Sequence, residues 1–356
     1  MAVAGISAYL SFLPLSGGST GLEGSQAFIP PANSEAQRMT TQIPAINTAL
    51  SSQAAQVLRG LALDEELKWR VPGDPVLGPL ARKVAQRYVA GETLPDALDR
   101  AQQVLSVGHR VNVEYMGESC RDPRRATEET DTFLSAARLL PPGCSISLDL
   151  SHIGLAVDAE LALANASRIA QATADTGREM VISAEGSDRT DEVLALHRKL
   201  CERFDHVGIT VQARLYRTAD DLPELLSRPG RIRLVKGAFL EPEAIAHRRE
   251  APALTTAYLA YAQRLADSGH LCSFATHDWD LINRVDQHLG GKGHDSDPWE
   301  FETLLGLGPD RLQAMAERGH PTREYIVFGT QWWLYVCNRI AEDPQRLLQA
   351  LVDAAA

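Results

Sequence analysis

Six short runs rich in β-branched and aliphatic residues decide the fold: RVNVEY (110–115), SISLDL (145–150), EMVISA (179–184), VGITVQ (207–212), RIRLV (231–235) and LCSFA (271–275). Two weaker runs follow near 300–305 and 324–328, and stretches with helical spacing separate most of the runs, as at 158–176, 190–204 and 254–268. Strands that alternate with helices predict a parallel sheet. The pattern fits an open doubly wound sheet and a closed (β/α)8 barrel, although no GxGxxG motif follows the first run.

The residues before the first run are predicted to be helical. The segment LGPLARKVAQRYVA (77–90) spaces its apolar residues at three and four, and Gly91 should end this helix. Thr93 is placed to cap a second helix, with Pro95 in its first turn and Val104 near its end.

Residues 1–45 differ in composition from the rest of the chain. They are rich in Ser, Gly, Ala and Pro and contain no Lys or Arg before Arg38, so we expect a loosely ordered extension. The expected organisation is this extension, a helical segment over 46–105, and an α/β unit over 106–356.

Composition excludes several classes of protein. Acidic residues outnumber basic ones by 46 to 35, which argues against nucleic acid as the main partner. No apolar run approaches the ~18 residues that a membrane-spanning helix needs. The five cysteines lie far apart without a CxxC pair, which disfavours a disulfide framework and predicts a cytoplasmic protein: Cys120, Cys144, Cys201, Cys272 and Cys337.

The ends of the six runs are unusually polar. They carry, in order, EYMGE (114–118), DLSH (149–152), SAE (183–185), QAR (212–214), KGAF (236–239) and THD (276–278). In a barrel these ends would form one ring around a polar pocket, because ligands bind at the carboxyl ends of the strands. His152, His277 and Glu185 show no metal-ligand spacing, so we expect no metal. The donors Arg233, Lys236, Gln212, Thr276 and His277 suit an anionic, amide-rich ligand such as a flavin dinucleotide.

A set of collinear motifs between about Leu77 and Pro344 resembles one known family, proline dehydrogenase. The matching segments are RYVAGETLPDALDRA (87–101), GES (117–119) for the family's LGE, RLVKGAF (233–239) for RLVKGAY, FATHD (274–278) for FATHN, EFETLLG (300–306) for EFQMLYG, and REYIVFGTQWWLYVCNRIAED (323–343) for the closing segment. The resemblance implies a distorted (β/α)8 barrel whose last helix lies over the strand ends. It also implies non-covalent FAD that accepts hydride from the carbon beside a ring nitrogen.

Roles for single residues follow from the resemblance by position. Arg233 would face the flavin N5, where a cation stabilises the reduced anionic ring, and Gln212 would face its pyrimidine edge. The full cofactor set implied is Gln212, Arg233, Lys236, Gly237, Ala238, Thr276, His277, Arg339 and Glu342. Tyr325 and Tyr335 resemble the two tyrosines that shape the family's substrate pocket, and Phe239 would cover it.

The expected substrate clamp departs from the family. Asp149 stands in LDLSHIGL (148–155) where the family's VKLTALGL has Lys, and the family's Arg pair is Asn338-Arg339 here. These exchanges lower the charge of the pocket by three units, and Glu118 loses the Arg with which it would pair. Each lost charge-assisted hydrogen bond to a substrate carboxylate is worth ~1.5–3 kcal/mol.

Three functions stay open on these observations. The first is an FAD-dependent dehydrogenase or oxidase that acts on a C–N or N–N bond of a small amine, with Asp149 as cation anchor or general base. Ordinary proline dehydrogenase activity is also consistent if Arg339 and Arg214 hold the carboxylate. The second is a non-catalytic FAD-binding or scaffold barrel, and the third is a metal-dependent barrel enzyme. The expected electron acceptor is a quinone, oxygen or a carrier.

Overall fold

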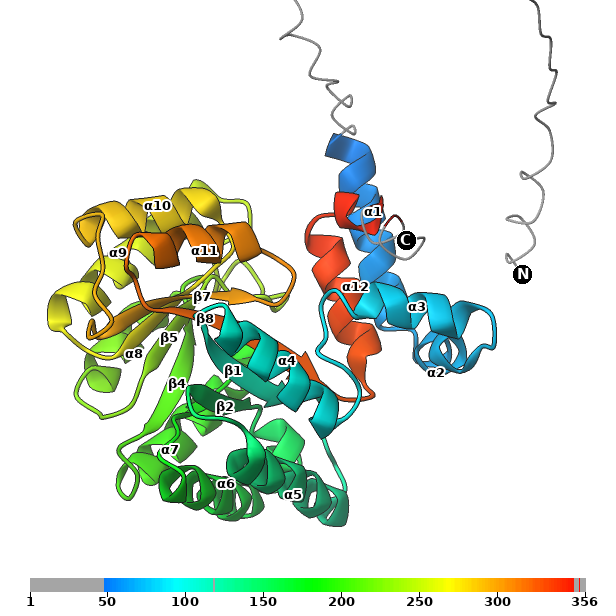
Figure 1. Ribbon diagram of the computed structural model, residues 1–356, viewed down its shortest axis with the longest axis horizontal. Helices are drawn as coiled ribbons and strands as arrows, with labels where there is room; N and C mark the ends of the chain where they lie inside the picture. Colours follow the sequence, from blue (N-terminus) through cyan, green and yellow to red (C-terminus); the bar gives the residue numbers. More distant parts are fainter. Residues whose placement is uncertain (1–47, 118, 349–351, 353–356) are drawn as a thin grey trace, which may run out of the picture. The chain divides into compact units, whose positions relative to one another are not determined.

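The computed structural model describes residues 48–117, 119–348 and 352. Eight parallel strands close into one barrel in chain order, with β1 paired to both β2 and β8 (Figure 1). The strands are β1 (Arg110–Tyr115), β2 (Cys144–Leu148), β3 (Met180–Ile182), β4 (Val207–Gln212), β5 (Ile232–Val235), β6 (Cys272–Ala275), β7 (Trp299–Leu304) and β8 (Thr322–Phe328). All eight predicted runs therefore form strands, and closure excludes the open-sheet alternative.

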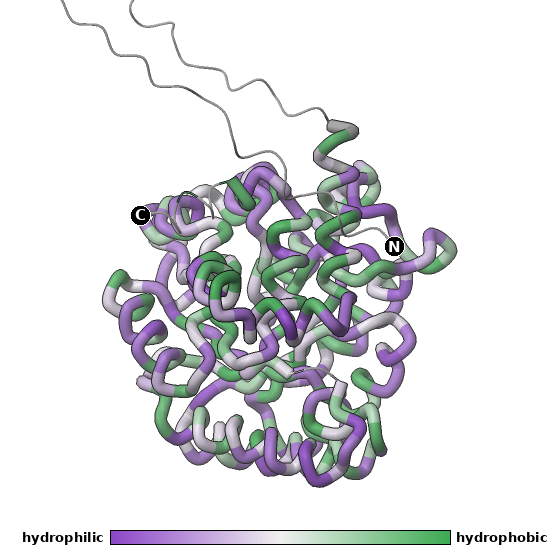
Figure 2. The backbone as a smooth tube through the Cα atoms, turned by 90° about the vertical axis from the view of Figure 1, so that its right-hand side faces the viewer, coloured by the Kyte–Doolittle hydropathy of each residue, from purple (hydrophilic) through white to green (hydrophobic). Residues whose placement is uncertain are grey.

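Helices surround the strands. They are α1 (Thr48–Ala62), α2 (Glu65–Gly73), α3 (Leu77–Ala85), α4 (Leu94–Ser106), α5 (Pro123–Leu139), α6 (Ala159–Asp175), α7 (Thr190–Cys201), α8 (Thr218–Leu225), α9 (Pro252–Ser268), α10 (Trp279–His288), α11 (Pro309–Glu317) and α12 (Trp332–Glu342). Figure 2 shows hydrophilic and hydrophobic residues mixed along them, as expected for helices with one buried side. Every helix of the described part is too short or too polar to cross a bilayer.

The predicted start of α4 is confirmed. The Thr93 side chain accepts a hydrogen bond from the Asp96 amide, and the Asp96 carboxylate accepts from the Thr93 amide, which forms a capping box. The prediction that one helix runs from residue 77 to Gly91 is wrong, because α3 ends at Ala85. Tyr88 and Val89 instead leave the helix and pack beneath α12, and the Ala90 amide donates to the Val327 carbonyl of β8.

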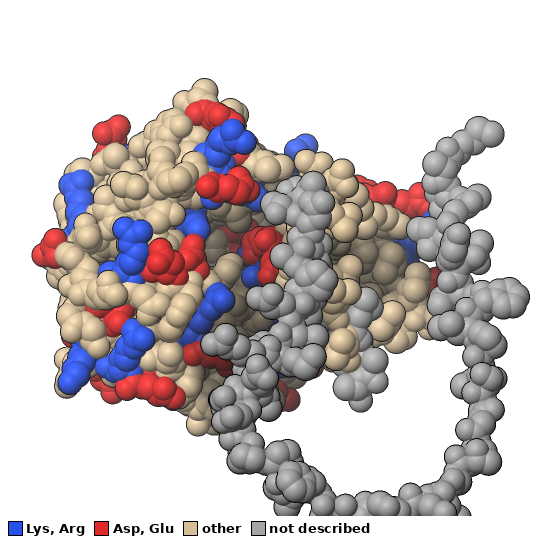
Figure 3. All heavy atoms as spheres, turned by 90° about the horizontal axis from the view of Figure 1, so that it is seen from above, with Lys and Arg blue, Asp and Glu red and all other residues tan. Residues whose placement is uncertain are grey.

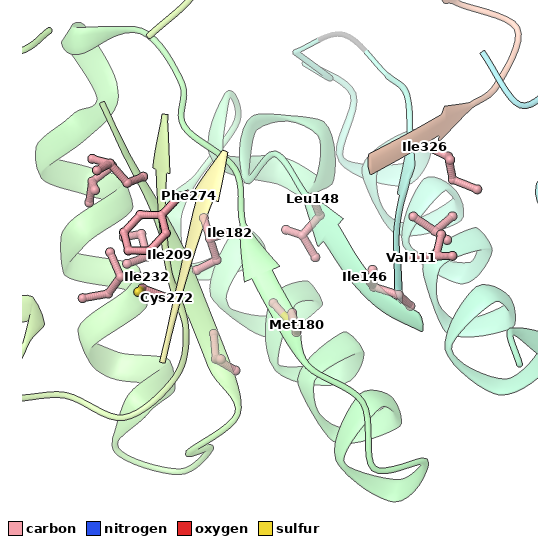
Figure 4. Packing of buried hydrophobic residues seen from close by; sticks show 14 of the residues in the cluster. Val111, Ile146, Leu148, Met180, Ile182, Ile209, Ile232, Cys272, Phe274 and Ile326 are labelled. Carbon is pink, nitrogen blue, oxygen red and sulfur yellow. The ribbon is translucent and has the colours of Figure 1, made fainter. Parts of the chain in front are cut away.

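Strand alternation separates an apolar shell from a polar interior. Apolar residues of the strands pack against the helices, among them Ile146, Leu148 and Ile182 (Figure 4). The alternate residues point to the barrel axis, where Arg323 binds Glu300 through Nε at 2.6 Å and Nη2 at 3.0 Å. Buried ions, rather than the usual branched aliphatic layers, therefore fill this end of the barrel.

The last helix lies beside the carboxyl end of β6, where Glu342 contacts His277. α12 follows β8 and packs against α1 and α3, and the Trp333 indole donates to the Leu61 carbonyl of α1 at 2.9 Å (Figure 1). The Trp332 indole donates to Glu92 at 2.9 Å. The predicted extension over 1–45 lies outside the described residues.

Candidate functional site

Arg233 is the central cation of the barrel mouth. It leaves β5 toward the axis and is only 3% exposed. Its Nε lies 3.0 Å from both carboxylate oxygens of Glu302 on β7, and Nη1 donates to Ser147 Oγ at 2.8 Å. The guanidinium also lies 4.9 Å from the centre of the Tyr325 ring. Nη2 finds no acceptor among the described residues, so a buried charged donor has one hydrogen bond left to make.

A second unpaired polar atom lies beside Gly237. Gln212, at the end of β4, donates from Nε2 to the Glu185 carbonyl at 2.9 Å, while its buried Oε1 finds no donor among the described residues. Gly237 has a φ of +107°, and a Cβ there would lie 2.7 Å from Arg214 side-chain carbons and 3.0 Å from Gln212 Oε1. Glycine is therefore required both by the backbone conformation and by the space around the Gln212 amide.

An ion pair links the ends of β5 and β6, and His277 after β6 contacts α12. Lys236 Nζ lies 3.0 Å from Asp278, whose backbone amide donates to Thr276 Oγ1 at 3.1 Å. The His277 ring lies 3.6 Å from Glu342 on α12. Thus the residues expected to hold phosphate and ribose meet in one place, at the edge of the last helix.

Glu342 has two strong partners. Burial raises its pKa, but the Arg339 guanidinium at 2.7 Å and the His277 ring outweigh burial and hold the pKa at about 2. Arg339 thereby uses one of its charged nitrogens within α12.

Carboxylates dominate the other side of the mouth. Glu114 on β1 is 9% exposed and accepts from Ser183 Oγ at 3.1 Å. Burial raises its pKa to about 7. Burial also raises the pKa of Asp149 well above its usual value, and the nearby charges of Glu114 and Glu185 add to this effect. Two carboxyl groups with raised pKa values in one buried space favour a shared proton or a cationic ligand.

Glu185 is better satisfied than its two neighbours. Its Oε1 accepts from the Ser151 amide and its Oε2 from Arg189, both at 2.9 Å.

Tyr325 on β8 and Tyr335 on α12, the predicted pocket tyrosines, pack against the same hydrophobic cluster. Burial raises the pKa of Tyr335, and its hydroxyl has no hydrogen-bond partner among the described residues. The Arg339 guanidinium lies 5.3 Å from the Tyr335 ring, and Tyr325 Oη lies 3.4 Å from Ser183 Oγ. Asn338 is half-buried on the same helix. Glu118 lies outside the described residues.

Arg214 has two nitrogens bound to backbone carbonyls and a buried Nε without a partner among the described residues. Its Nη1 donates to the Phe239 carbonyl and its Nη2 to the His247 carbonyl at 3.0 Å. The side chain therefore fastens the segment after β5, and Phe239 on that segment is 40% exposed. The carbonyl of the neighbouring Ala238 accepts a hydrogen bond from the Arg249 side chain.

His152 turns away from the site. Its ring lies 3.4 Å from Glu129 on α5, and a Cβ at Gly117 would lie 2.0 Å from its Nε2. Within residues 48–117 and 119–348 no group of His, Cys, Asp and Glu side chains is arranged to hold a metal ion.

Sequence reasoning missed the roles of two residues. Glu302 lies within the quoted EFETLLG segment, where the family motif has Gln, but nothing in one sequence pairs it with Arg233 on β5. Glu114 stood among the polar strand ends without an assigned role. A charge inside a β-branched strand is the one signal that could have singled out either residue.

A closed (β/α)8 barrel with a charged, helix-covered mouth defines an enzyme-type fold. The family model "Proline dehydrogenase" matches residues 97–334. Proline dehydrogenase from Deinococcus radiodurans is 31% identical over 76% of this chain and 91% of its own length. Proline dehydrogenase 1 from Bacillus subtilis is 30% identical over 73% of this chain and 87% of its own length. The chain therefore belongs to the proline dehydrogenase family and is an oxidoreductase of that type.

Solved structures support the fold. Proline utilization A from Bdellovibrio bacteriovorus, inactivated by N-propargylglycine, superposes with a TM-score of 0.68 at 15% identity. The match covers 82% of this chain and 36% of that one, so the chain spans about a third of the length of this relative. The predicted barrel and the predicted family are both confirmed.

Proposed function

We propose that the protein oxidises a small amine with FAD, by hydride transfer from a C–N bond, and that plain L-proline is not its preferred substrate. An N–N bond is the second bond type that this chemistry allows. The observation that carries the proposal is the mouth itself, where Arg233 and Gln212 have buried polar atoms without partners among the described residues and Asp149 stands among other carboxylates.

The unpaired polar atoms fit a flavin. Gln212 Oε1 could accept from the pyrimidine N–H, and Arg233 Nη2 could donate at the N5 side of the ring. Lys236 and His277 would hold the phosphate and ribose, with Thr276 beside them. A flavin bound there would supply the hydride acceptor. The chain's own part is to orient the ring, exclude water with α12 and place a cation beside it.

The substrate side supports a cationic or uncharged ligand. Asp149 lies near Glu114 and Glu185, so a carboxylate would meet repulsion where the family places a Lys. Arg339 is held by Glu342, and Arg214 by two backbone carbonyls. Tyr325 and Tyr335 would pack against the carbon skeleton of the substrate, with Phe239 at the rim.

Two alternatives remain testable beside this proposal. Ordinary proline dehydrogenase activity would use Arg339 or Arg214, each of which has a buried Nε without a partner among the described residues. A non-catalytic barrel would bind FAD without any amine reducing it.

The visible spectrum before and after anaerobic addition of substrate tests the proposal. We expect a flavin spectrum that cationic or esterified cyclic amines bleach at lower concentration than L-proline does. Efficient bleaching by L-proline would establish the ordinary activity instead. A flavin that no amine reduces would favour the non-catalytic barrel, and a protein that takes up no FAD would overturn the cofactor assignment.

A further inference from the structure

The barrel mouth contains two acidic side chains, Asp149 and Glu114, to which the proposed function gives no separate roles. The Asp149 side chain has no hydrogen-bond donor among the residues described, and the charges of Glu114, Glu185 and Arg189 act on it. Glu114 accepts from Ser183, and the Arg233 charge stabilises its ionised form. Burial raises the pKa of both groups, and of the two only Glu114 has a described hydrogen-bond donor and the Arg233 charge beside it.

Glu114 is also connected to the expected reaction centre. Ser183 Oγ lies between Glu114 Oε2 at 3.1 Å and Tyr325 Oη at 3.4 Å. The Tyr325 ring in turn lies against Arg233, the residue with the unpaired Nη2. Glu114 is thus the carboxylate that hydrogen bonds link through Ser183 to the pocket tyrosine, whose ring lies against the central cation.

We propose that Glu114 is the general base that removes the proton from the substrate ammonium, while Asp149 anchors the substrate. This inference rests on the proposed function and names the base for it. In the first step one N–H bond of the ammonium breaks and one O–H bond forms, so the Glu114 carboxylate becomes a carboxylic acid and the substrate becomes a neutral amine. In the second step the carbon beside the nitrogen would give a hydride, with both electrons of its C–H bond, to a flavin bound at this mouth. The nitrogen lone pair becomes the second bond of C=N, and the product leaves as an iminium cation. The proton passes from Glu114 to solvent through the carboxyl groups at the mouth.

The requirement for a base is chemical. A protonated nitrogen has no lone pair to push toward the forming C=N bond, so hydride can leave only after the ammonium loses its proton. An acceptor serves best when it titrates near the working pH. Burial raises the pKa of Glu114 to about 7, which meets this requirement.

Charged and titratable groups face Glu114 from all sides of the mouth. Those that oppose its ionisation or titrate with it are Asp149 after β2, Glu185 after β3, Glu302 on β7 and Tyr335 on α12, while Arg233 on β5 favours ionisation and Tyr325 on β8 is linked through Ser183. Glu114 therefore titrates together with its neighbours. Its own contribution is measured by substituting Glu114, because the pH titration of the wild type reports all of these groups at once.

The first measurement does not depend on turnover. Difference infrared spectra of the full chain between pH 5.5 and 8.5 report loss of protonated carboxyl groups. We expect a band that disappears near neutral pH in the wild type and in D149N, and that is absent in E114Q. E324Q is the matched control, because Glu324 is a buried glutamate with a raised pKa on the outer side of β8. A neutral-pH band that survives in E114Q would overturn the inference.

The second measurement is flavin reduction by an amine that reduces the wild type, followed anaerobically by stopped flow. We expect E114Q to slow the limiting rate by about 10²–10⁴-fold and to remove its rise with pH, with partial recovery in E114D. The affinity for an N,N-dimethylpyrrolidinium ion, which has no proton to give, should change less than threefold.

D149N should weaken that affinity, and E324Q should match the wild type in both readouts. An unchanged rate in E114Q with an active wild type would refute the base alone. A wild type that no amine reduces would refute the proposed function, and the base with it.

Discussion

Restoring the family's positive charges should restore affinity for L-proline. The double variant D149K/N338R places a Lys after β2 and an Arg next to Arg339 on α12. Each charge-assisted hydrogen bond to the substrate carboxylate is worth ~1.5–3 kcal/mol, so the two together could gain about 3–6 kcal/mol. The structure indicates the lower half of that range, because a Lys at 149 would also face the carboxylates of Glu114 and Glu185. We therefore expect about a 10²–10³-fold lower dissociation constant.

The assay is anaerobic titration of the FAD-loaded protein with L-proline, read as the concentration that bleaches half of the flavin. D149N is the matched control, since it removes the negative charge and supplies no cation. It should recover only the repulsive part of the effect, and D149K/N338R should exceed it by at least tenfold. If the double variant binds L-proline no better than D149N, the charge argument fails. If the wild type already reaches half bleaching at the same concentration, the clamp is not altered in function.

Three further results follow from the geometry. G237A should lose FAD, because the added Cβ meets side chains in the cofactor cradle. The control G108A has a φ of +93° and nothing within 4 Å of the added Cβ, so it should have the same backbone strain and keep FAD. Equal retention of FAD by both variants would contradict this reasoning. E302L should lower the free energy of unfolding by about 3–5 kcal/mol by leaving Arg233 buried without its partner, and an unchanged thermal midpoint would contradict it. The proton on Glu114 stabilises the fold most below pH 4.5, and that stabilisation is lost as pH rises through about 7. E114Q should thus gain about 3 kcal/mol over the wild type at pH 8 and almost nothing at pH 4.5, measured by denaturant unfolding, and a gain independent of pH would refute the raised pKa.

Surface charge agrees with the composition argument on the face that is visible in Figure 3. Acidic and basic side chains are interspersed there, and neither sign forms a large patch.

All five cysteines are free thiols. Location in the cytoplasm stays a prediction, as does the division of the chain at residues 45 and 105.

Local patterns determined the secondary structure well. The six β-branched runs and the two weaker ones all became strands, because alternation and β-branching act over a few neighbouring residues. The cap at Thr93 was readable for the same reason. The end of α3 could not be predicted in this way. Tyr88 and Val89 continue the helical spacing in the sequence, but they leave the helix to pack against α12, which lies more than 240 residues later in the chain.

The site divides in the same way. The sequence by itself determined the barrel elements, the polar strand ends and, through ordered motifs, the family and the exchange of Lys for Asp149. Only the tertiary structure decided that Glu302 neutralises Arg233, that backbone carbonyls hold Arg214, and that Glu114 shares Ser183 with Tyr325. The physical reason is that pairing, burial and proton affinity depend on distances between strands. Closure of the barrel sets those distances, and no neighbourhood in the sequence contains them.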